Sequence, residues 1–265
     1  DVIRPLVSSD QLHTIDALSF YIVNYFITSL AGLFLYLFLL ELKFKPERSL
    51  MGVLIFLGSR ITILSTGAPM VDSLYHLAII VIVYFCLTQR SMLLCLLTPL
   101  LILTKETTVP FLFLPLLLKT INRKLILLSL SVSFAILFWV RSLVTATVPN
   151  VSKSEHPILV TITSHLSSGL DSLSQSYFSL AGWHDLFSPF SVFWVIALFG
   201  AWIEIKKIDT YYEIPRFLFW IIPIALGYTV LSSNAGRMLH SLFPLVIPYA
   251  LIAIDYIMSR KQLKD

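Results

Sequence analysis

Charged residues set among apolar segments are the strongest chemical signal in this sequence. Lys105 and Glu106 interrupt the apolar stretch LILTKETTVPFLF. A charged side chain at membrane depth is unfavourable unless it is paired or functional. One interpretation is an anion-recognising lysine beside a carboxylate that orients it or acts as an acid or base. The other is a polar turn between two helices, in which the lysine side chain extends to the membrane surface.

A second polar group precedes the apolar run SLYHLAIIVIVYF, in which Asp72 is followed by Tyr75 and His76. Aspartate is a preferred N-cap and is stabilised by the positive end of a helix, so capping is the favoured interpretation for Asp72 taken alone. His76 could contact a ligand, but a hydrogen-bonded histidine at the membrane interface is the favoured interpretation.

A third polar group opens the last apolar segment, where Arg237 follows SSNAG and His240 comes one turn later. Residues three apart on a helix share a face. Arg237 is interpreted as a phosphate ligand, assisted by the N–H groups at the start of the helix. Contact with lipid headgroups is the alternative.

The elements that must position these residues are predicted to be membrane helices. Of the residues, 57% are hydrophobic and only 13% are charged, and the mean hydropathy is +0.86. Soluble domains carry about 25% charged residues. Backbone in lipid must satisfy its own hydrogen bonds, so apolar runs of this kind predict helices. We expect an all-α transmembrane bundle, with residues 1–265 forming a single domain of nine segments: 17–40, 50–66, 73–88, 91–104, 107–118, 125–147, 187–205, 214–232 and 238–258.

The basic residues predict an orientation. Thirteen of the 19 fall in loops on one side, which the positive-inside rule assigns to the cytoplasm. Nine crossings then place the N-terminus outside and the C-terminus inside, with residues 1–16 and 148–186 as outer segments. Lys105, Glu106, Asp72 and Arg237 all fall toward the outer side, and we expect them to line one outward-facing cavity. Arg60 and Arg141 are interpreted as salt-bridge partners of Asp72 or Glu106.

The composition excludes some classes of function. The net charge of +4 and the pI near 9.0 do not indicate nucleic-acid binding, because the basic residues lie in short clusters between apolar runs. The two cysteines, Cys86 and Cys95, lie in apolar runs and are interpreted as small buried hydrophobic residues. No Cys/His spacing indicates a metal site.

Four short stretches, taken in order, resemble a known family. They are Arg4-Pro5-Leu6, Met70-Val71-Asp72-Ser73-Leu74, Thr104-Lys105-Glu106 with Pro110 and Pro115, and Gly236-Arg237 with Phe243-Pro244. In order and sidedness they resemble the C-type integral membrane glycosyltransferases, which use polyprenyl-phosphate-linked sugars. Relatives in that group include the protein O-mannosyltransferases and the aminoarabinose transferase of lipid A.

The resemblance implies sugar transfer from a polyprenyl-phosphate carrier at the outer face of a bacterial inner membrane, with membrane lipid and the lipid-linked sugar as partners. Lys105 and Arg237 would stabilise the phosphate leaving group, and Asp72, His76 and His240 would support the site. A divalent metal is possible in this family, although no cofactor is evident in the sequence.

The family's catalytic acid lies in the first outer loop, after a first helix. The chain resembles a family member that lacks this helix, and Asp1, Asp10 and Glu106 are the candidates for the acid. The alternative is a non-catalytic accessory subunit of a larger membrane complex on the same scaffold. A transporter is disfavoured because no paired repeat with broken helices is found.

Overall fold

The computed structural model describes residues 9–68, 71–147, 167, 170–171, 174, 179–208, 212–231 and 235–262. Within these ranges the protein is entirely helical, and no strand is present. The described elements are α1 (Ser9–Glu41), α2 (Pro46–Leu57), α3 (Arg60–Gly67), α4 (Asp72–Leu87), α5 (Ser91–Thr104), the 3-10 helix η2 (Glu106–Leu117), α6 (Arg123–Thr147), α8 (Leu180–Phe187), α9 (Phe193–Ile205), η3 (Arg216–Trp220), α10 (Ile221–Leu231), α11 (Ala235–Leu239), η4 (His240–Leu242) and α12 (Phe243–Gln262).

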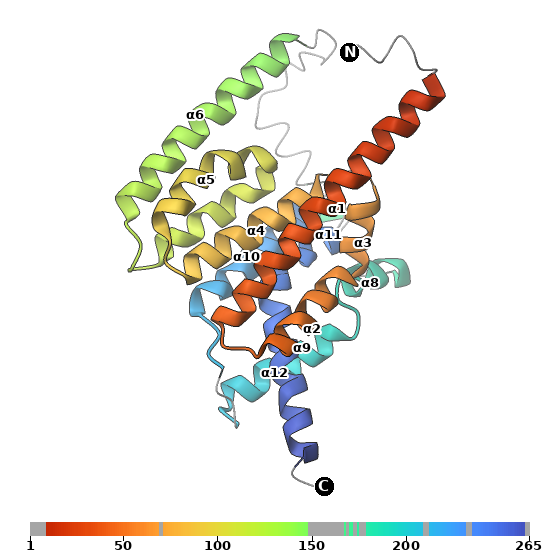
Figure 1. Cartoon of the computed structure of the whole chain (residues 1–265), viewed down its shortest axis with the longest axis vertical. Helices are drawn as coiled ribbons and strands as arrows, with labels where there is room; N and C mark the ends of the chain where they lie inside the picture. Colours follow the sequence, from red (N-terminus) through yellow and green to blue (C-terminus); the bar gives the residue numbers. More distant parts are fainter. Residues whose placement is uncertain are drawn as a thin grey trace.

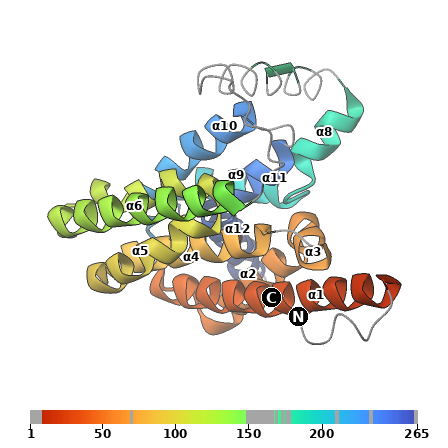
Figure 2. The same cartoon turned by 90° about the horizontal axis from the view of Figure 1, so that it is seen from above.

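Helix α4 forms the centre of the fold. Its side chains from Ala78 to Cys86 are all buried, and it packs against α1, α3, α5 and η2. A helix that is apolar on every face belongs in a protein core. Figures 1 and 2 show α1 along one side of this core and α5 and α6 on another. The beginning of α4 therefore lies where several elements meet.

The expectation of nine membrane crossings is not confirmed. Among the described residues, three helices are long and apolar enough to cross a membrane, Ile15–Glu41, Arg123–Leu143 and Ala235–Arg260, and a bent pair formed by α2 and α3 would add a fourth. The other apolar segments are shorter than the roughly 20 residues that a crossing needs. Helix α4 is one of these shorter segments, and most of its side chains are buried within the protein. The apolar helices indicate a membrane protein.

Two segments that were predicted as membrane helices have a different structure from the one expected. Segment 50–66 divides at Gly58 and Ser59, where the axes of α2 and α3 differ by 62°. Segment 107–118 lies in the 3-10 helix η2, which contains Pro110 and Pro115. Proline lacks an N–H and clashes with the preceding turn, which explains why this segment does not continue as an α-helix.

The outer segments differ from the expectation in part. Helix α1 already begins at Ser9, and helix α8 lies inside the predicted loop 148–186. Residues 1–8 and most of 148–178 lie outside the described residues.

Helix α12 is fixed to α9 by close packing at Gly200. A Cβ atom at this position would lie 1.8 Å from the carbonyl oxygen of Tyr249. Only glycine permits such an approach of two helix backbones, a packing mode that is common in membrane proteins. The Tyr249 hydroxyl donates to Glu204 on α9 at 3.1 Å, which adds a polar contact to the same interface.

A second polar cluster lies where α2, α12 and the segment before η3 meet. The Asp255 carboxylate accepts from Arg48 and from the Tyr212 hydroxyl, the latter at 2.6 Å. The Tyr212 ring stacks on Phe44, with ring centroids 4.3 Å apart. Burial and the bond to Asp255 raise the pKa of Tyr212 above its ordinary value, so this hydroxyl remains a donor at neutral pH.

We expect Gly200→Ala to destabilise the protein by about 1–3 kcal/mol, because the added methyl group overpacks the α9–α12 contact. The measurement is the thermal unfolding midpoint of the full chain in detergent. Gly227→Ala is the matched control, since a Cβ there meets nothing within 4 Å and alanine favours the helix. Equal midpoints for the two variants would contradict the close approach.

Candidate functional site

The Asp72 carboxylate is the point at which three separate parts of the chain meet. One oxygen, Oδ1, accepts from Lys105 Nζ at 2.7 Å, and the other, Oδ2, accepts from the guanidinium of Arg237. Asp72 opens α4, Lys105 joins α5 to η2, and Arg237 lies in α11. The Asp72 side chain is only 5% exposed, so a charge this deeply buried requires such partners.

This geometry replaces the favoured interpretation of Asp72 as a helix cap. The N-cap of α4 is Val71, and no side chain caps the helix. Both carboxylate oxygens are bound to cations from other elements instead. The position in the first turn still places the carboxylate at the positive end of the helix, which stabilises it further.

The Lys105 ammonium has a second contact in addition to its ion pair with Asp72. Its ammonium lies 5.4 Å from the ring centroid of Tyr75, one turn along α4 from Asp72. The side chain is 18% exposed. The Lys105 charge is therefore paired with a buried carboxylate, and the position of Lys105 relative to the membrane surface stays a prediction.

Behind this cluster lies a chain of buried hydrogen bonds. His240 Nδ1 lies 3.0 Å from His76 Nε2, and His240 Nε2 lies 2.8 Å from Ser59 Oγ and 3.4 Å from Thr62 Oγ1. His240 and His76 are both buried, with 0% and 2% exposure. His76 is thus a satisfied histidine, as favoured from the sequence, but it lies in the core and not at an interface.

The spacing of the residues along their helices explains why the Asp72 cluster and the histidine pair lie between the same elements. Asp72 and His76 are four residues apart on α4, and Arg237 and His240 are three residues apart on the facing segment of α11 and η4. Residues at these spacings lie on one face of a helix. The Asp72–Arg237 and His76–His240 pairs therefore form two successive layers of polar contacts between the same elements.

Helix α3 is held in place beside these two side-chain pairs by polar contacts. Asn24 of α1 donates to the carbonyl of Ala68 at 2.9 Å, and Ser73 of α4 donates to the carbonyl of Ser65 at 3.2 Å. Ser59 caps the helix by accepting from the backbone N–H of Thr62 at 3.3 Å. These bonds fix the sharp turn that carries Ser59.

A cavity of about 170 Å³ opens beside Asp72 and Arg237. Its lining also includes Arg60 and Asp185, which form an ion pair at 3.3 Å, and Gly236. The expected salt bridge from Arg60 to Asp72 is not formed, because Arg60 pairs with Asp185 and Asp72 binds Lys105 and Arg237. The alternative bridge to Glu106, whose side chain lies outside the described residues, stays a prediction. Asp185 was not a candidate from the sequence, where it lies in a long polar stretch without a recognisable motif.

The expected single cavity is present in part. Asp72 and Arg237 line it, whereas Lys105 contacts Asp72 without being one of the residues that line the cavity. The side chains of Glu106 and Asp10, and the whole of Asp1, lie outside the described residues. The interactions of Arg141 with Asp72 or Glu106 likewise stay a prediction.

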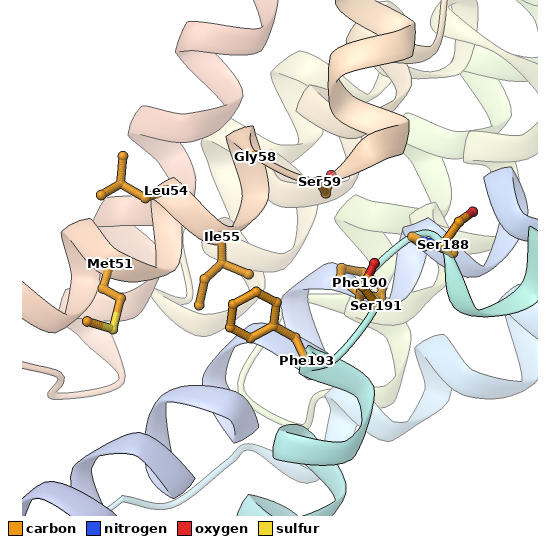
Figure 3. Close-up of a pocket in the computed structure, with 10 residues that line it drawn as sticks. Met51, Leu54, Ile55, Gly58, Ser59, Ser188, Phe190, Ser191 and Phe193 are labelled. Atoms are coloured by element: carbon orange, nitrogen blue, oxygen red, sulfur yellow. The ribbon is translucent and has the colours of Figure 1, made fainter. Parts of the chain in front are cut away.

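An apolar groove of about 310 Å³ lies next to the charged cavity, on the other side of the α2–α3 turn. Figure 3 shows Met51, Leu54 and Ile55 of α2 on one side and Phe190 and Phe193 on the other. Ser59 also lines this groove. Ser188 lines both spaces, so the apolar groove and the charged cavity adjoin each other.

The cluster does not suit a divalent metal. Asp72 is a single carboxylate held between two cations, and a metal ion prefers several anionic or neutral donors. No group of three or more His, Cys, Asp or Glu side chains suited to a metal occurs in the part of the chain that the structure describes.

Comparison with known proteins adds no further assignment. No family model matches the chain, and no curated protein or solved structure matches it.

Asp72→Asn should destabilise the protein by about 3 kcal/mol, because removing one member of a buried ion cluster leaves the others unpaired. The thermal unfolding midpoint in detergent measures this effect. Asp185→Asn is the control, since its carboxylate is 57% exposed and an exposed pair contributes about 0–1 kcal/mol. If Asp72→Asn unfolds no earlier than Asp185→Asn, the buried cluster is not a stabilising element.

Proposed function

We propose that the protein is a membrane glycosyltransferase-like protein that binds the phosphate of a polyprenyl-phosphate-linked sugar. The observation that carries the proposal is the convergence of Lys105 and Arg237 on a buried carboxylate at the edge of a cavity. We place this site at the outer face of the bacterial inner membrane, with the N-terminus outside and the C-terminus in the cytoplasm.

The charge balance of the site favours an anionic ligand. Lys105, Arg237 and Arg60 bring three positive charges, whereas Asp72 and Asp185 bring two negative charges, which leaves one positive charge in excess. Arginine presents several N–H donors in a planar fork, so Arg237 can serve Asp72 and a phosphate together. Partial burial strengthens these interactions relative to water.

The adjoining spaces favour an amphiphilic ligand. A phosphate in the charged cavity would leave its apolar chain next to the groove formed by α2 and the α8–α9 connection. A ligand with a charged head and an apolar tail uses both spaces, whereas a free sugar phosphate would use only one.

Sugar transfer requires an acidic residue that deprotonates the acceptor hydroxyl, while the cations stabilise the departing phosphate. Lys105 and Arg237 supply the second role in this proposal, and Asp72 holds both in position. Asp1, Asp10 and Glu106 are the proposed candidates for the acid. His76 and His240 support the site through their contact with each other in the layer behind Asp72 and Arg237.

Binding of polyprenyl phosphate to the purified full chain in detergent tests the proposal, with the polyprenol of the same chain length as the matched ligand. Hydrogen bonds to charged groups contribute about 1.5–3 kcal/mol, so we expect roughly a ten- to hundredfold preference for the phosphate. Arg237→Ala and Lys105→Ala should remove most of this preference.

Arg90→Ala is the control variant, because this exposed arginine lies beyond the far end of α4. Arg237→Lys keeps the charge and separates loss of the fork from loss of the fold. Equal binding of the phosphate and the polyprenol would contradict the proposal. Phosphate-specific binding without sugar transfer to any tested acceptor would support the accessory-subunit alternative.

A further inference from the structure

The hydrogen-bond chain from Ser59 to His76 has the order of groups found in nucleophilic catalysis. A hydroxyl, Ser59 Oγ, lies 2.8 Å from a histidine nitrogen, and the other nitrogen of the same ring lies 3.0 Å from a third group. Activated serines are recognised by this arrangement of nucleophile, base and orienting group, independently of fold. Nothing in the sugar-transfer proposal uses Ser59.

The turn that carries Ser59 adds a second feature of such sites. Ser59 stands at the 62° bend between α2 and α3, immediately before the first turn of α3. The first N–H groups of a helix have no acceptor within the helix, which makes those of Arg60 and Ile61 available to stabilise an oxyanion. Ser59 is the N-cap of α3 with an extended backbone, φ -68° and ψ 141°, so its hydroxyl stands at the start of the helix beside these N–H groups.

The base is held rigidly. The ring of His240 is stacked between Phe56 and Phe190, with centroid distances of 5.8 and 5.2 Å. His76 Nε2 accepts when His240 Nδ1 donates, and His240 Nε2 then keeps a lone pair toward Ser59. Ser59 Oγ has a second acceptor within reach, Thr62 Oγ1 at 2.8 Å, so the proposal requires its proton to turn from Thr62 to His240. This tautomer gives Ser59 a base that cannot rotate away.

The neighbouring space defines the substrate. Ser59 lines the groove of about 310 Å³, which is within the size range of ligand pockets, roughly 300–1,000 Å³. The groove walls beside it are apolar, from Met51, Ile55 and Phe193 (Figure 3). An acyl chain suits this lining, and its carbonyl carbon would lie at the end of the groove where Ser59 is found.

We propose that Ser59 is the nucleophile of an acyl-transfer site for lipid esters, with His240 as its base and His76 as the residue that positions the base. Ser59 Oγ attacks the ester carbonyl carbon and its proton passes to His240 Nε2. The bond from that carbon to the ester oxygen breaks, and His240 returns the proton to the departing alcohol. Water or an acceptor alcohol then attacks the acyl-serine and loses its proton to His240. The bond from the acyl carbon to Ser59 Oγ breaks, and His240 returns the proton to Ser59.

A fluorophosphonate probe tests the nucleophile directly on the purified full chain, with the adduct mapped by mass spectrometry. We expect the adduct on Ser59 and its loss after heat denaturation. Labelling of Ser188 or Ser191 instead, equal labelling of the denatured chain, or no labelling at all would overturn the proposal. No variant is needed for this measurement, so it does not depend on how a mutant folds.

The base and its positioning residue are tested by the rate of labelling. His240→Phe keeps the aromatic packing but removes the base, and should slow labelling at least tenfold. His76→Phe should also slow it, whereas His76→Gln should restore part of the rate, because the amide oxygen can accept from His240. Ser131→Ala on α6 is the control. Unchanged rates in His240→Phe, or identical rates in the two His76 variants, would overturn these roles.

Ester hydrolysis tests the groove. The rate of p-nitrophenolate release should rise at least tenfold from the acetate to the octanoate ester, and Ile55→Trp, which fills the groove, should abolish that preference. Equal rates for the two esters in the unaltered chain would overturn the assignment of the groove. Failure here leaves phosphate recognition in the proposed function untouched, because that recognition depends on Lys105 and Arg237 and is measured separately from ester hydrolysis.

Discussion

The buried carboxylate of Asp72 is the constraint on which the arrangement of the polar site depends. A charge that is removed from water must be compensated by partners, and here both partners come from distant parts of the chain. Lys105 fixes the junction of α5 and η2, and Arg237 fixes α11. Because all three charges meet at the first turn of α4, the end of the most deeply buried helix sets the position of two others.

The Asp72 cluster also determines where the His76–His240 contact forms. Once Arg237 is bound to Asp72, the residue one turn further along each element must also face its counterpart. His76 and His240 therefore meet in the core, and the ring of His240 carries the contact on to Ser59 at the turn between α2 and α3. A charged cavity and an apolar groove lie on the two sides of that turn and adjoin at Ser188. One ion cluster thus positions a site with two chemically different halves.

The sequence predicts the cluster better than it predicts the fold around it. The unfavourable energy of charge in an apolar segment singled out Asp72, Lys105 and Arg237, and the structure brings these three together. Their partners could not be assigned, because the same energetic argument applies to Arg60, which binds Asp185 instead. The His76–His240 contact also escaped prediction, although the matching spacing of Asp72 with His76 and of Arg237 with His240 is a signal that could have found it.

The nine predicted membrane crossings are not confirmed, and the way hydropathy is read explains why. Hydropathy does not distinguish a helix that faces lipid from one enclosed by other helices, because both exclude water. Helix α4 is apolar because it is surrounded by protein, and η2 is apolar but contains two prolines that prevent a regular α-helix. Of these elements, α1, α6 and the segment from α11 to α12 are long enough to cross a membrane, whereas α4 is shorter; the α11–α12 segment is itself largely buried. The short helices enclose the polar groups, and this enclosure is what permits a buried carboxylate, two histidines and a serine to remain hydrogen-bonded within so apolar a chain.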